Sequence, residues 1–222
     1  MISAIQRRRR VHLPDLAGLA LLVLSVALAG CGSIIPKPPT PPTQFLLQDE
    51  ASAADIIPAA PQPAAPASTL IVHEPRAAAG FDSRKIAYVR TANDLEYFAS
   101  NEWVDVPSRM LAPLLVRAVE RTGAFRAVVQ APSSAVGGLQ LDTELIRLQQ
   151  DFAVTPSRVR LTLRAVLIDT ASRRVVASRE FNASVVSRSD DPSGGAAAAN
   201  EAAHLVLVEV AALCAEAAQR PN

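Results

Sequence analysis

The sequence is poor in the residue types that build most catalytic and metal sites. Its 222 residues include three histidines, two cysteines and nine glycines, and aromatic residues make up 4% of the chain. It contains no HExxH pair, no glycine-rich phosphate loop and no GxSxG elbow. His73 and His204 stand far apart, without carboxylate or cysteine companions at the spacing of metal ligands. We therefore expect no enzymatic activity, no metal and no cofactor.

An excess of basic residues is also missing. The formal net charge is +1, and four of the basic residues are the consecutive arginines Arg7 to Arg10. Without residues 1–30, the chain has 18 basic and 20 acidic residues. A nucleic-acid-binding protein needs a concentrated basic surface. We expect no nucleic-acid partner.

Two cysteines are too few for a disulfide framework. Cys214 ends the apolar run that begins at Leu205, and this setting predicts a small buried hydrophobic residue. A reactive or dimer-forming thiol is the alternative interpretation. The other cysteine, Cys31, has a different setting near the N-terminus.

One apolar run near the N-terminus, from Leu16 to Ala29, is too short to span a bilayer comfortably. Preceded by Arg7 to Arg10, it has the pattern of a secretory signal. The run ends in Leu28, Ala29, Gly30 and Cys31, which resemble the lipobox of bacterial lipoproteins. This resemblance implies cleavage after Gly30 and lipidation of Cys31 with a diacylglyceryl group. The alternative is a plain secretory signal with an incidental cysteine.

Lipidation would fix the chain to a membrane. Each buried methylene group contributes roughly 0.8 kcal/mol, so two or three acyl chains hold a protein almost permanently. The residue after the cysteine is Gly32, whereas an aspartate there favours retention at the inner membrane in enteric-type bacteria. The expected location is the periplasmic face of the outer membrane, with the inner membrane as the alternative.

Residues 31–68 have the composition of a tether between the lipid and a domain. The stretch from Gly32 to Pro42 contains five prolines, and polyproline geometry with about 3.1 Å per residue gives it a reach of about 30 Å. Thr43 to Leu47 is predicted to be a short strand that docks on the domain. A stretch rich in proline and alanine, from Asp49 to Ser68, is not expected to fold alone. The expected organisation is a signal peptide over 1–30, a tether over 31–68 and a domain over 69–222.

The domain alternates predicted strands and helices. Apolar residues at three- and four-residue spacing predict a helix from Pro107 to Gly123, in which Pro113 is expected to cause a kink. An alanine-rich segment from about Ala196 to Ala218 predicts a second, packed helix. Strands are expected at Leu70–Val72, Arg84–Arg90, Leu95–Phe98, Phe125–Val129, Leu139–Phe152, Arg158–Ile168 and Val175–Val185.

Two of these strands carry informative patterns. The apolar phase of Leu139–Phe152 slips around Leu145 and Ile146, which predicts a β-bulge. Arg158–Ile168 alternates cleanly, so its apolar residues share one face and its arginines the other. Val175 is expected on the apolar face of the last strand. The predicted fold class is α/β: a single domain with a mixed β-sheet of about five to six strands and two main helices.

An acidic and aromatic cluster precedes the first helix. Glu102, Trp103 and Asp105 together resemble a sugar-gripping set. The alternative interpretation is a tryptophan that fills the edge of the core beside the start of a helix.

Several segments in combination resemble the ABC-type transport auxiliary lipoprotein family. They are Lys85-Ile-Ala-Tyr-Val-Arg, Leu95-Glu-Tyr-Phe, Glu102-Trp103, a leucine-rich helix and Gly123-Ala-Phe125. Proteins of that family accompany ABC transporters that have mammalian-cell-entry (MCE) subunits. The resemblance implies an α/β domain without enzymatic activity, because a separate subunit hydrolyses ATP. One departure is Glu102, since the residue before the tryptophan is often basic in the family.

The resemblance predicts a membrane-anchored periplasmic component that docks on an MCE-domain protein and supports lipid transport or envelope integrity. Tyr97 and Trp103 are candidate partner-binding residues, with core packing as the alternative for both. A homo-oligomer is a further expectation by analogy. Two other functional interpretations are a stand-alone lipid- or glycan-binding envelope lipoprotein and an envelope hydrolase.

Overall fold

One long strand, β7, organises the sheet. A computed structural model of the chain describes residues 40–48 and 68–219, and those from Pro41 onward belong to one compact unit. The elements, in chain order, are β1 (Thr43–Phe45), β2 (Leu70–Val72), β3 (Arg76–Ala77), β4 (Lys85–Val89), β5 (Leu95–Trp103), α2 (Pro107–Glu120), β6 (Val128–Gln130), β7 (Leu139–Asp151), β8 (Arg158–Asp169), β9 (Val175–Val186) and α3 (Pro192–Ala218).

The two edges of β7 are used differently. One edge pairs antiparallel with β8 along its length, and β8 in turn pairs antiparallel with β9. The other edge takes three short strands end to end, β2, β3 and β4, all parallel to β7. Outside these, β6 pairs with β2, β5 pairs antiparallel with β4, and β1 pairs parallel with β5. The result is one mixed sheet.

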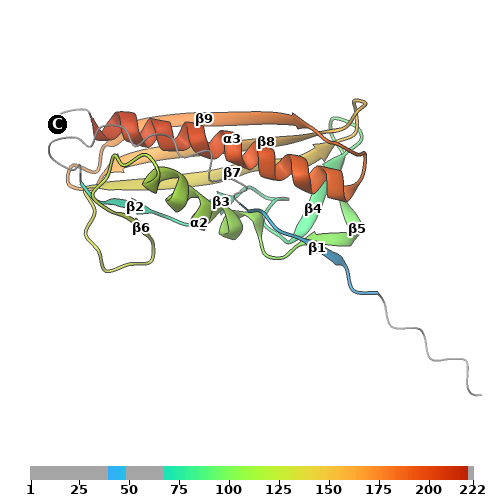
Figure 1. The fold of residues 1–222 in the computed structure, drawn as a ribbon, viewed down its shortest axis with the longest axis horizontal. Coiled ribbons are helices and arrows are strands. Elements are labelled where there is room, and N and C mark those ends of the chain that lie inside the picture. The colour runs from blue at the N-terminus through green and yellow to red at the C-terminus, as the bar shows by residue number, and fades with distance from the viewer. Residues whose placement is uncertain (1–39, 49–67, 220–222) are drawn as a thin grey trace, which may run out of the picture. The chain divides into compact units, whose positions relative to one another are not determined.

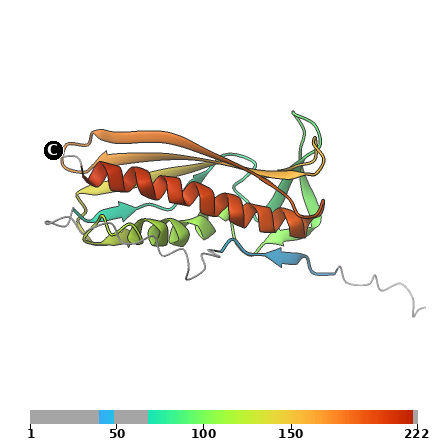
Figure 2. The same ribbon diagram turned by 45° about the horizontal axis from the view of Figure 1, so that its top comes forward.

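Both helices lie on one face of this sheet, side by side (Figures 1 and 2). Helix α3 packs along β8 and β9, whereas α2 packs against α3 and β6. The core forms between the helices and the sheet, from residues such as Leu115, Leu163 and Val210. We call the opposite face of the sheet the open face.

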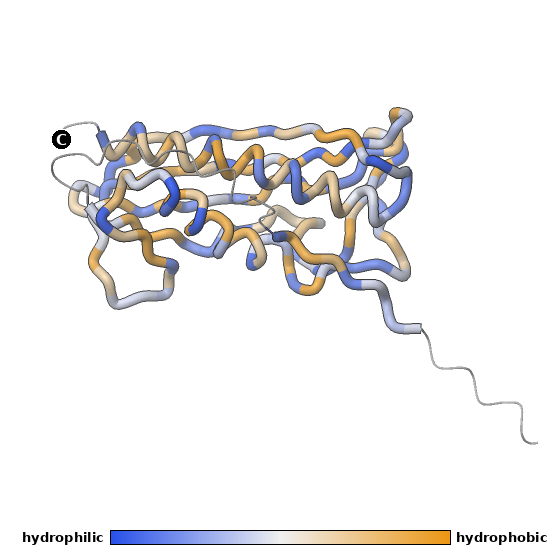
Figure 3. Tube along the Cα trace, viewed as in Figure 1, coloured by the Kyte–Doolittle hydropathy of each residue, from blue (hydrophilic) through white to orange (hydrophobic). Residues whose placement is uncertain are grey.

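Alternation of side chains separates the two faces. Hydrophobic and hydrophilic residues alternate along the tube of β8 in Figure 3. Val159, Leu161, Leu163, Ala165 and Leu167 are all buried, as the sequence predicts. Val175 in β9 departs from its prediction, because it is 60% exposed. The register of β8 and β9 shifts next to it, and this irregularity ends the regular alternation.

Helix α2 runs from Pro107 to Glu120 and includes Pro113, which is exposed. Proline has no N–H, so the carbonyl of Arg109 lacks the usual intrahelical donor. Gly123 follows the helix with a φ of 63°, a conformation that glycine adopts easily. Gly123, the predicted stop of this helix, is therefore the residue at which the chain turns away after α2.

Helix α3 has the length and hydropathy that a membrane-crossing helix also has. Its alanine-rich side is nevertheless packed on the sheet, with Ala199, Ala202 and Val206 almost fully buried. Asp191 caps its N-terminus by accepting a hydrogen bond from the backbone N–H of Gly194 at 2.8 Å. The predicted packed helix is present, and it begins four residues earlier than expected.

The predicted α/β class with two main helices is confirmed, but the predicted strand number is wrong. Over the residues that the structure describes, the sheet has nine strands and not five to six. Because β7 is 13 residues long, its edge accommodates β2, β3 and β4 in succession. Strand β3 has only two residues, Arg76 and Ala77, and its parallel pairing with β7 leaves no periodic signal in the sequence.

Candidate functional site at the joint between tether and domain

The predicted lipidation site and lipobox, Cys31 with Leu28, Ala29 and Gly30, lie outside the described residues. The described part of the predicted tether begins at Thr40. It enters the domain as β1, whose residues Thr43, Gln44 and Phe45 pair with the end of β5. The backbone N–H of Val104 donates to the carbonyl of Phe45 at 2.8 Å. The tether thus continues directly into the sheet.

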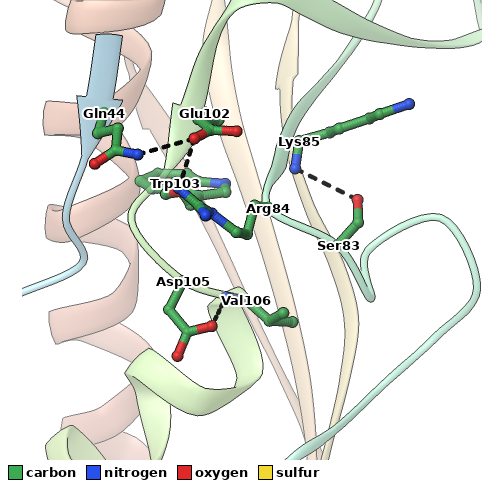
Figure 4. A network of polar contacts seen from close by, with 8 residues as sticks. All are labelled: Gln44, Ser83, Arg84, Lys85, Glu102, Trp103, Asp105 and Val106. Atoms are coloured by element: carbon green, nitrogen blue, oxygen red, sulfur yellow. Dashed lines mark hydrogen bonds and ion pairs between the residues drawn. The ribbon is translucent and has the colours of Figure 1, made fainter. Parts of the chain in front are cut away.

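Glu102 connects β1 to the body of the domain (Figure 4). Its Oε1 accepts a hydrogen bond from Gln44 Nε2 at 2.9 Å and forms an ion pair with Arg84 Nη2 at 2.5 Å. Arg84 also donates from Nε to the carbonyl of Trp103 at 3.0 Å. An acidic residue before the tryptophan therefore serves here as an acceptor shared by the tether and the domain.

A second connection comes from helix α3. The side-chain Nδ2 of Asn200 donates to the carbonyl of Leu46 at 3.2 Å. Its Oδ1 accepts from the backbone N–H of Gln48 at 2.9 Å. Beyond the end of β1, the tether has no neighbouring strand in the described part of the chain to pair with. The side-chain amide of Asn200 instead provides one donor and one acceptor for its backbone.

Leu47 adds an apolar contribution to this joint. Its side chain is 3% exposed and belongs to the core, whereas the preceding Leu46 is 48% exposed. Full burial of a leucine side chain stabilises by about 1.5–3 kcal/mol. Segment 43–48, the strand and the residues that follow it, is accordingly held by backbone pairing, by Asn200 and by a buried side chain. We call it the tether joint.

Trp103, one of the two candidate partner-binding residues, is 3% exposed and lies in the core. It is part of β5, and the two acidic residues near it in the chain have other partners. Glu102 binds Gln44 and Arg84, and Asp105 Oδ1 accepts from the backbone N–H of Val106 at 2.7 Å. The tryptophan fills the core beside the start of α2, as the packing interpretation predicts.

Tyr97, the other candidate, lies on β5 opposite Ala87 of β4 and is partly exposed. Its hydroxyl donates to the carbonyl of Gly80 at 3.0 Å, and Lys85 Nζ lies 5.2 Å from the centre of its ring. This tyrosine therefore fastens the loop before β4 to the sheet.

Two titratable residues singled out in the sequence are His73 and Cys214. His73 Nδ1 lies 3.1 Å from Asp142 Oδ1. Cys214 is fully buried in α3, and this burial raises the pKa of its thiol to about 12. The prediction of a small buried hydrophobic residue at this position is confirmed.

Two aspartates accept hydrogen bonds at the start of α3. Asp190 Oδ1 accepts from the backbone N–H of Ser157 at 2.8 Å, and hydrogen bonds from Ser157 lower the pKa of this carboxyl group. The hydrogen bond from the backbone N–H of Gly194 has the same effect on the pKa of Asp191. Both carboxylates are therefore favoured in the folded state.

Sequence reasoning missed Asn200, which holds the tether joint directly, and Arg84, which binds Glu102 beside it. A signal for Asn200 does exist, because it interrupts the alanine-rich start of a buried helix. A polar side chain in such a position usually has a hydrogen-bond partner. Arg84 offers no comparable signal, because it is one of many arginines that stand beside a strand.

One family model matches most of this chain. The family model described as the ABC-type transport auxiliary lipoprotein component matches residues 50–211. A search of curated proteins gives no match. The matched range begins just after the tether joint and covers the whole sheet except β1.

Two crystal structures show the same fold. A protein of family DUF330 from Xanthomonas campestris is 27% identical, with a TM-score of 0.65, over 81% of this chain and 95% of that one. An uncharacterised protein is 11% identical, with a TM-score of 0.60, over 79% of this chain and 99% of the other. The second likeness concerns the fold alone.

Proposed function

This chain belongs to the ABC-type transport auxiliary lipoprotein family, and we propose that it is the lipid-anchored periplasmic partner of an MCE-type ABC transporter. The family resemblance in the sequence is thereby confirmed, and the family implies a location in the cell envelope. The anchor would be Cys31, with the signal removed after Gly30. The protein would act without catalysis, by docking on the transporter and supporting lipid transport or envelope integrity.

The observation that carries this proposal is the tether joint. A tether ending in a loose loop would let the domain turn freely relative to its anchor. Here segment 43–48 instead pairs with β5, buries Leu47 and is held by Asn200. The distance from the anchor to the domain is then set by the short stretch between Cys31 and Thr43. Such an arrangement suits a protein that must present its domain at a defined height above a membrane.

Gly32 supports the outer membrane as the location of the anchor, because no aspartate follows the cysteine. The inner membrane would suit the same domain with the opposite orientation of the tether. Separation of the two membranes on a density gradient distinguishes these locations. We expect the protein in the outer-membrane fraction, and a Gly32→Asp variant shifted toward the inner membrane in an enteric-type host.

Affinity purification tests the partnership. The tagged lipoprotein is extracted from envelopes with a mild non-ionic detergent after chemical cross-linking, and co-purifying proteins are identified by mass spectrometry. An MCE-domain protein should be recovered with the wild-type chain, and more weakly with the unanchored Cys31→Ala variant. Repeated failure to recover an MCE-domain protein under these conditions would contradict the proposal. The mass of the purified complex also tests whether several copies assemble.

A further inference from the structure

The β-bulge in β7 places two adjacent side chains on the open face. Leu145 pairs with Leu163 and Arg147 with Thr162, so Ile146 is the extra residue of the bulge. Leu145 and Leu148 are both buried on the helix side. Ordinary alternation would send Ile146 and Arg147 to opposite faces, but here both line one cavity on the open face. Bulges of this kind often re-aim side chains beside functional sites.

The cavity has a volume of about 550 Å³. This volume falls within the range of small-molecule sites. Its floor includes Val89 of β4 and Gln149 of β7, and one wall is the turn between β4 and β5. The further lining residues that matter for the argument are Phe81, Asp94, Leu95, Asp151 and Arg160.

Two basic and two acidic residues line the cavity, so their charges cancel. Only one of the basic residues forms an ion pair with one of the acidic residues. Arg160 Nη2 lies 2.8 Å from Oδ2 of Asp151, which is 7% exposed, so these two neutralise one another. Arg147 and Asp94 make no ion pair within the described residues. The cavity thus offers one unpaired cation on β7 and one unpaired anion on the turn after β4.

Apolar side chains lie between these two charges. Phe81 and Ile146 are partly buried, and Leu95 is exposed at the rim. Gln149 has no side-chain hydrogen bond within the described residues, so its amide is available as a donor or acceptor. The lining therefore combines separated opposite charges with a hydrophobic surface.

One wall of the cavity is held in place before any ligand arrives. The hydroxyl of Tyr97 donates to the carbonyl of Gly80, next to Phe81. Gly80 has a φ of 91°, a conformation that side-chain-bearing residues rarely adopt. A Cβ atom there would lie 2.8 Å from Leu95 Cδ2, so the leucine side chain would have to shift. A wall fixed in this way lowers the cost of ordering it on binding.

We infer that this cavity binds a zwitterionic amphiphile. Its anionic oxygens would bind the guanidinium of Arg147, its ammonium group the carboxylate of Asp94, and a short apolar portion would contact Ile146, Leu95 and Phe81. A ligand with only negative charge could pair with Arg147 but would be repelled by Asp94. A ligand without charge would form no ion pair with either residue. The inference does not depend on the transporter partnership, because it rests on the cavity alone.

The test uses the mature chain, residues 31–222 with Cys31→Ser, so that no detergent is needed. Isothermal titration calorimetry measures binding of dihexanoylphosphatidylethanolamine below its micelle concentration. Dihexanoylphosphatidylglycerol, with the same chains but no amine, and hexyl glucoside, with no charge, are the comparison ligands. Glycerophosphoethanolamine, the head group without chains, distinguishes a free small zwitterion from a lipid. Circular dichroism confirms that each protein is folded.

Two substitutions identify the cavity. Arg147→Gln should weaken binding of the ethanolamine lipid about tenfold or more, because a charge-assisted contact is lost. Asp94→Asn should weaken binding of the ethanolamine lipid and strengthen binding of the glycerol lipid, so the order of the two affinities should reverse. Arg179→Gln on β9 and Glu201→Gln on α3 are the matched controls, and neither should change the affinity. All four positions are exposed, so the variants should fold.

Each outcome bears on the inference. Tighter binding of the ethanolamine lipid, with the charge-dependent reversal in Asp94→Asn, supports it. Equal affinity for the head group alone overturns it, because the apolar portion of the ligand would then contribute nothing and the ligand would be a free zwitterion. Equal binding of the two lipids by the wild-type chain, or unchanged binding in Arg147→Gln, overturns it. Absence of binding by all probes overturns it as well.

Discussion

Asn200 in helix α3 and Leu46 in the tether are 154 residues apart, yet the amide of one donates to the backbone carbonyl of the other at 3.2 Å. The same amide accepts from the backbone N–H of Gln48 at 2.9 Å. A helix that covers the core thereby also holds the end of the predicted tether. This link makes segment 43–48 a part of the folded domain.

Replacing Asn200 should loosen the tether joint without unfolding the domain. Asn200→Ala removes both hydrogen bonds, and a typical net contribution of about 1 kcal/mol each predicts a small loss of stability. Hydrogen exchange should show faster exchange of the Gln48 amide. Asn200→Asp keeps the acceptor and should preserve most of this protection. Unchanged exchange at Gln48 in Asn200→Ala would show that the amide does not hold the tether.

Two neighbouring leucines form a matched pair. Leu47→Ala should reduce the free energy of unfolding by about 2–5 kcal/mol, because it leaves a cavity in the core. Leu46→Ala should have little effect, since that side chain is half exposed. Urea denaturation of both variants measures the difference. Equal stability of the two would contradict the burial of Leu47 in the joint.

Cys214 should be unreactive in the folded protein. Burial raises the pKa of its thiol to about 12, so almost no thiolate exists at pH 8. A maleimide should label the unfolded Cys31→Ser chain within minutes and the folded one only as fast as it opens. The raised pKa also means that this group stabilises the fold below pH 9.0 and ceases to do so as the pH rises toward 12. Rapid labelling of the native chain would indicate an accessible thiol.

Asp191 should contribute to the acid sensitivity of the fold. The hydrogen bond from Gly194 lowers the pKa of this carboxyl group, so its stabilising effect is present above the ordinary pKa of 3.8 and is lost as the pH falls through the lower pKa of the folded state. Asp191→Asn keeps a capping side chain but cannot titrate in this range. Its melting temperature should fall less steeply between pH 5 and pH 2 than that of the wild type. Parallel pH profiles would assign the acid sensitivity to other groups.

Much of the fold follows from local patterns that sequence carries well. The phase slip at Ile146 predicts the bulge, and the alternation from Arg158 to Ile168 predicts which face of β8 is buried. The leucine spacing before Gly123 predicts α2. In each case one side of a regular element is apolar, so the period of the element is visible in the residues.

What escaped prediction depends on contacts between distant segments. The two-residue β3 exists only because β7 offers an unpaired edge beside it. The ion pair of Arg84 with Glu102 requires the register of β4 with β5, which no local pattern sets. The position of Asn200 opposite Leu46 depends on how α3 crosses the end of β1. Sequence patterns locate elements, but pairings across the chain arise from packing.

We propose that the anchor is part of the function, and the Cys31→Ala variant tests this proposal most directly. The measurement is complementation of a deletion strain under envelope stress, by the wild-type gene and by Cys31→Ala, with a second chain in which residues 32–222 follow an ordinary cleavable secretory signal. Circular dichroism and equal periplasmic amounts establish that the soluble chain is folded and present. We predict that only the lipidated protein restores growth. Full restoration by the soluble chain would contradict the claim.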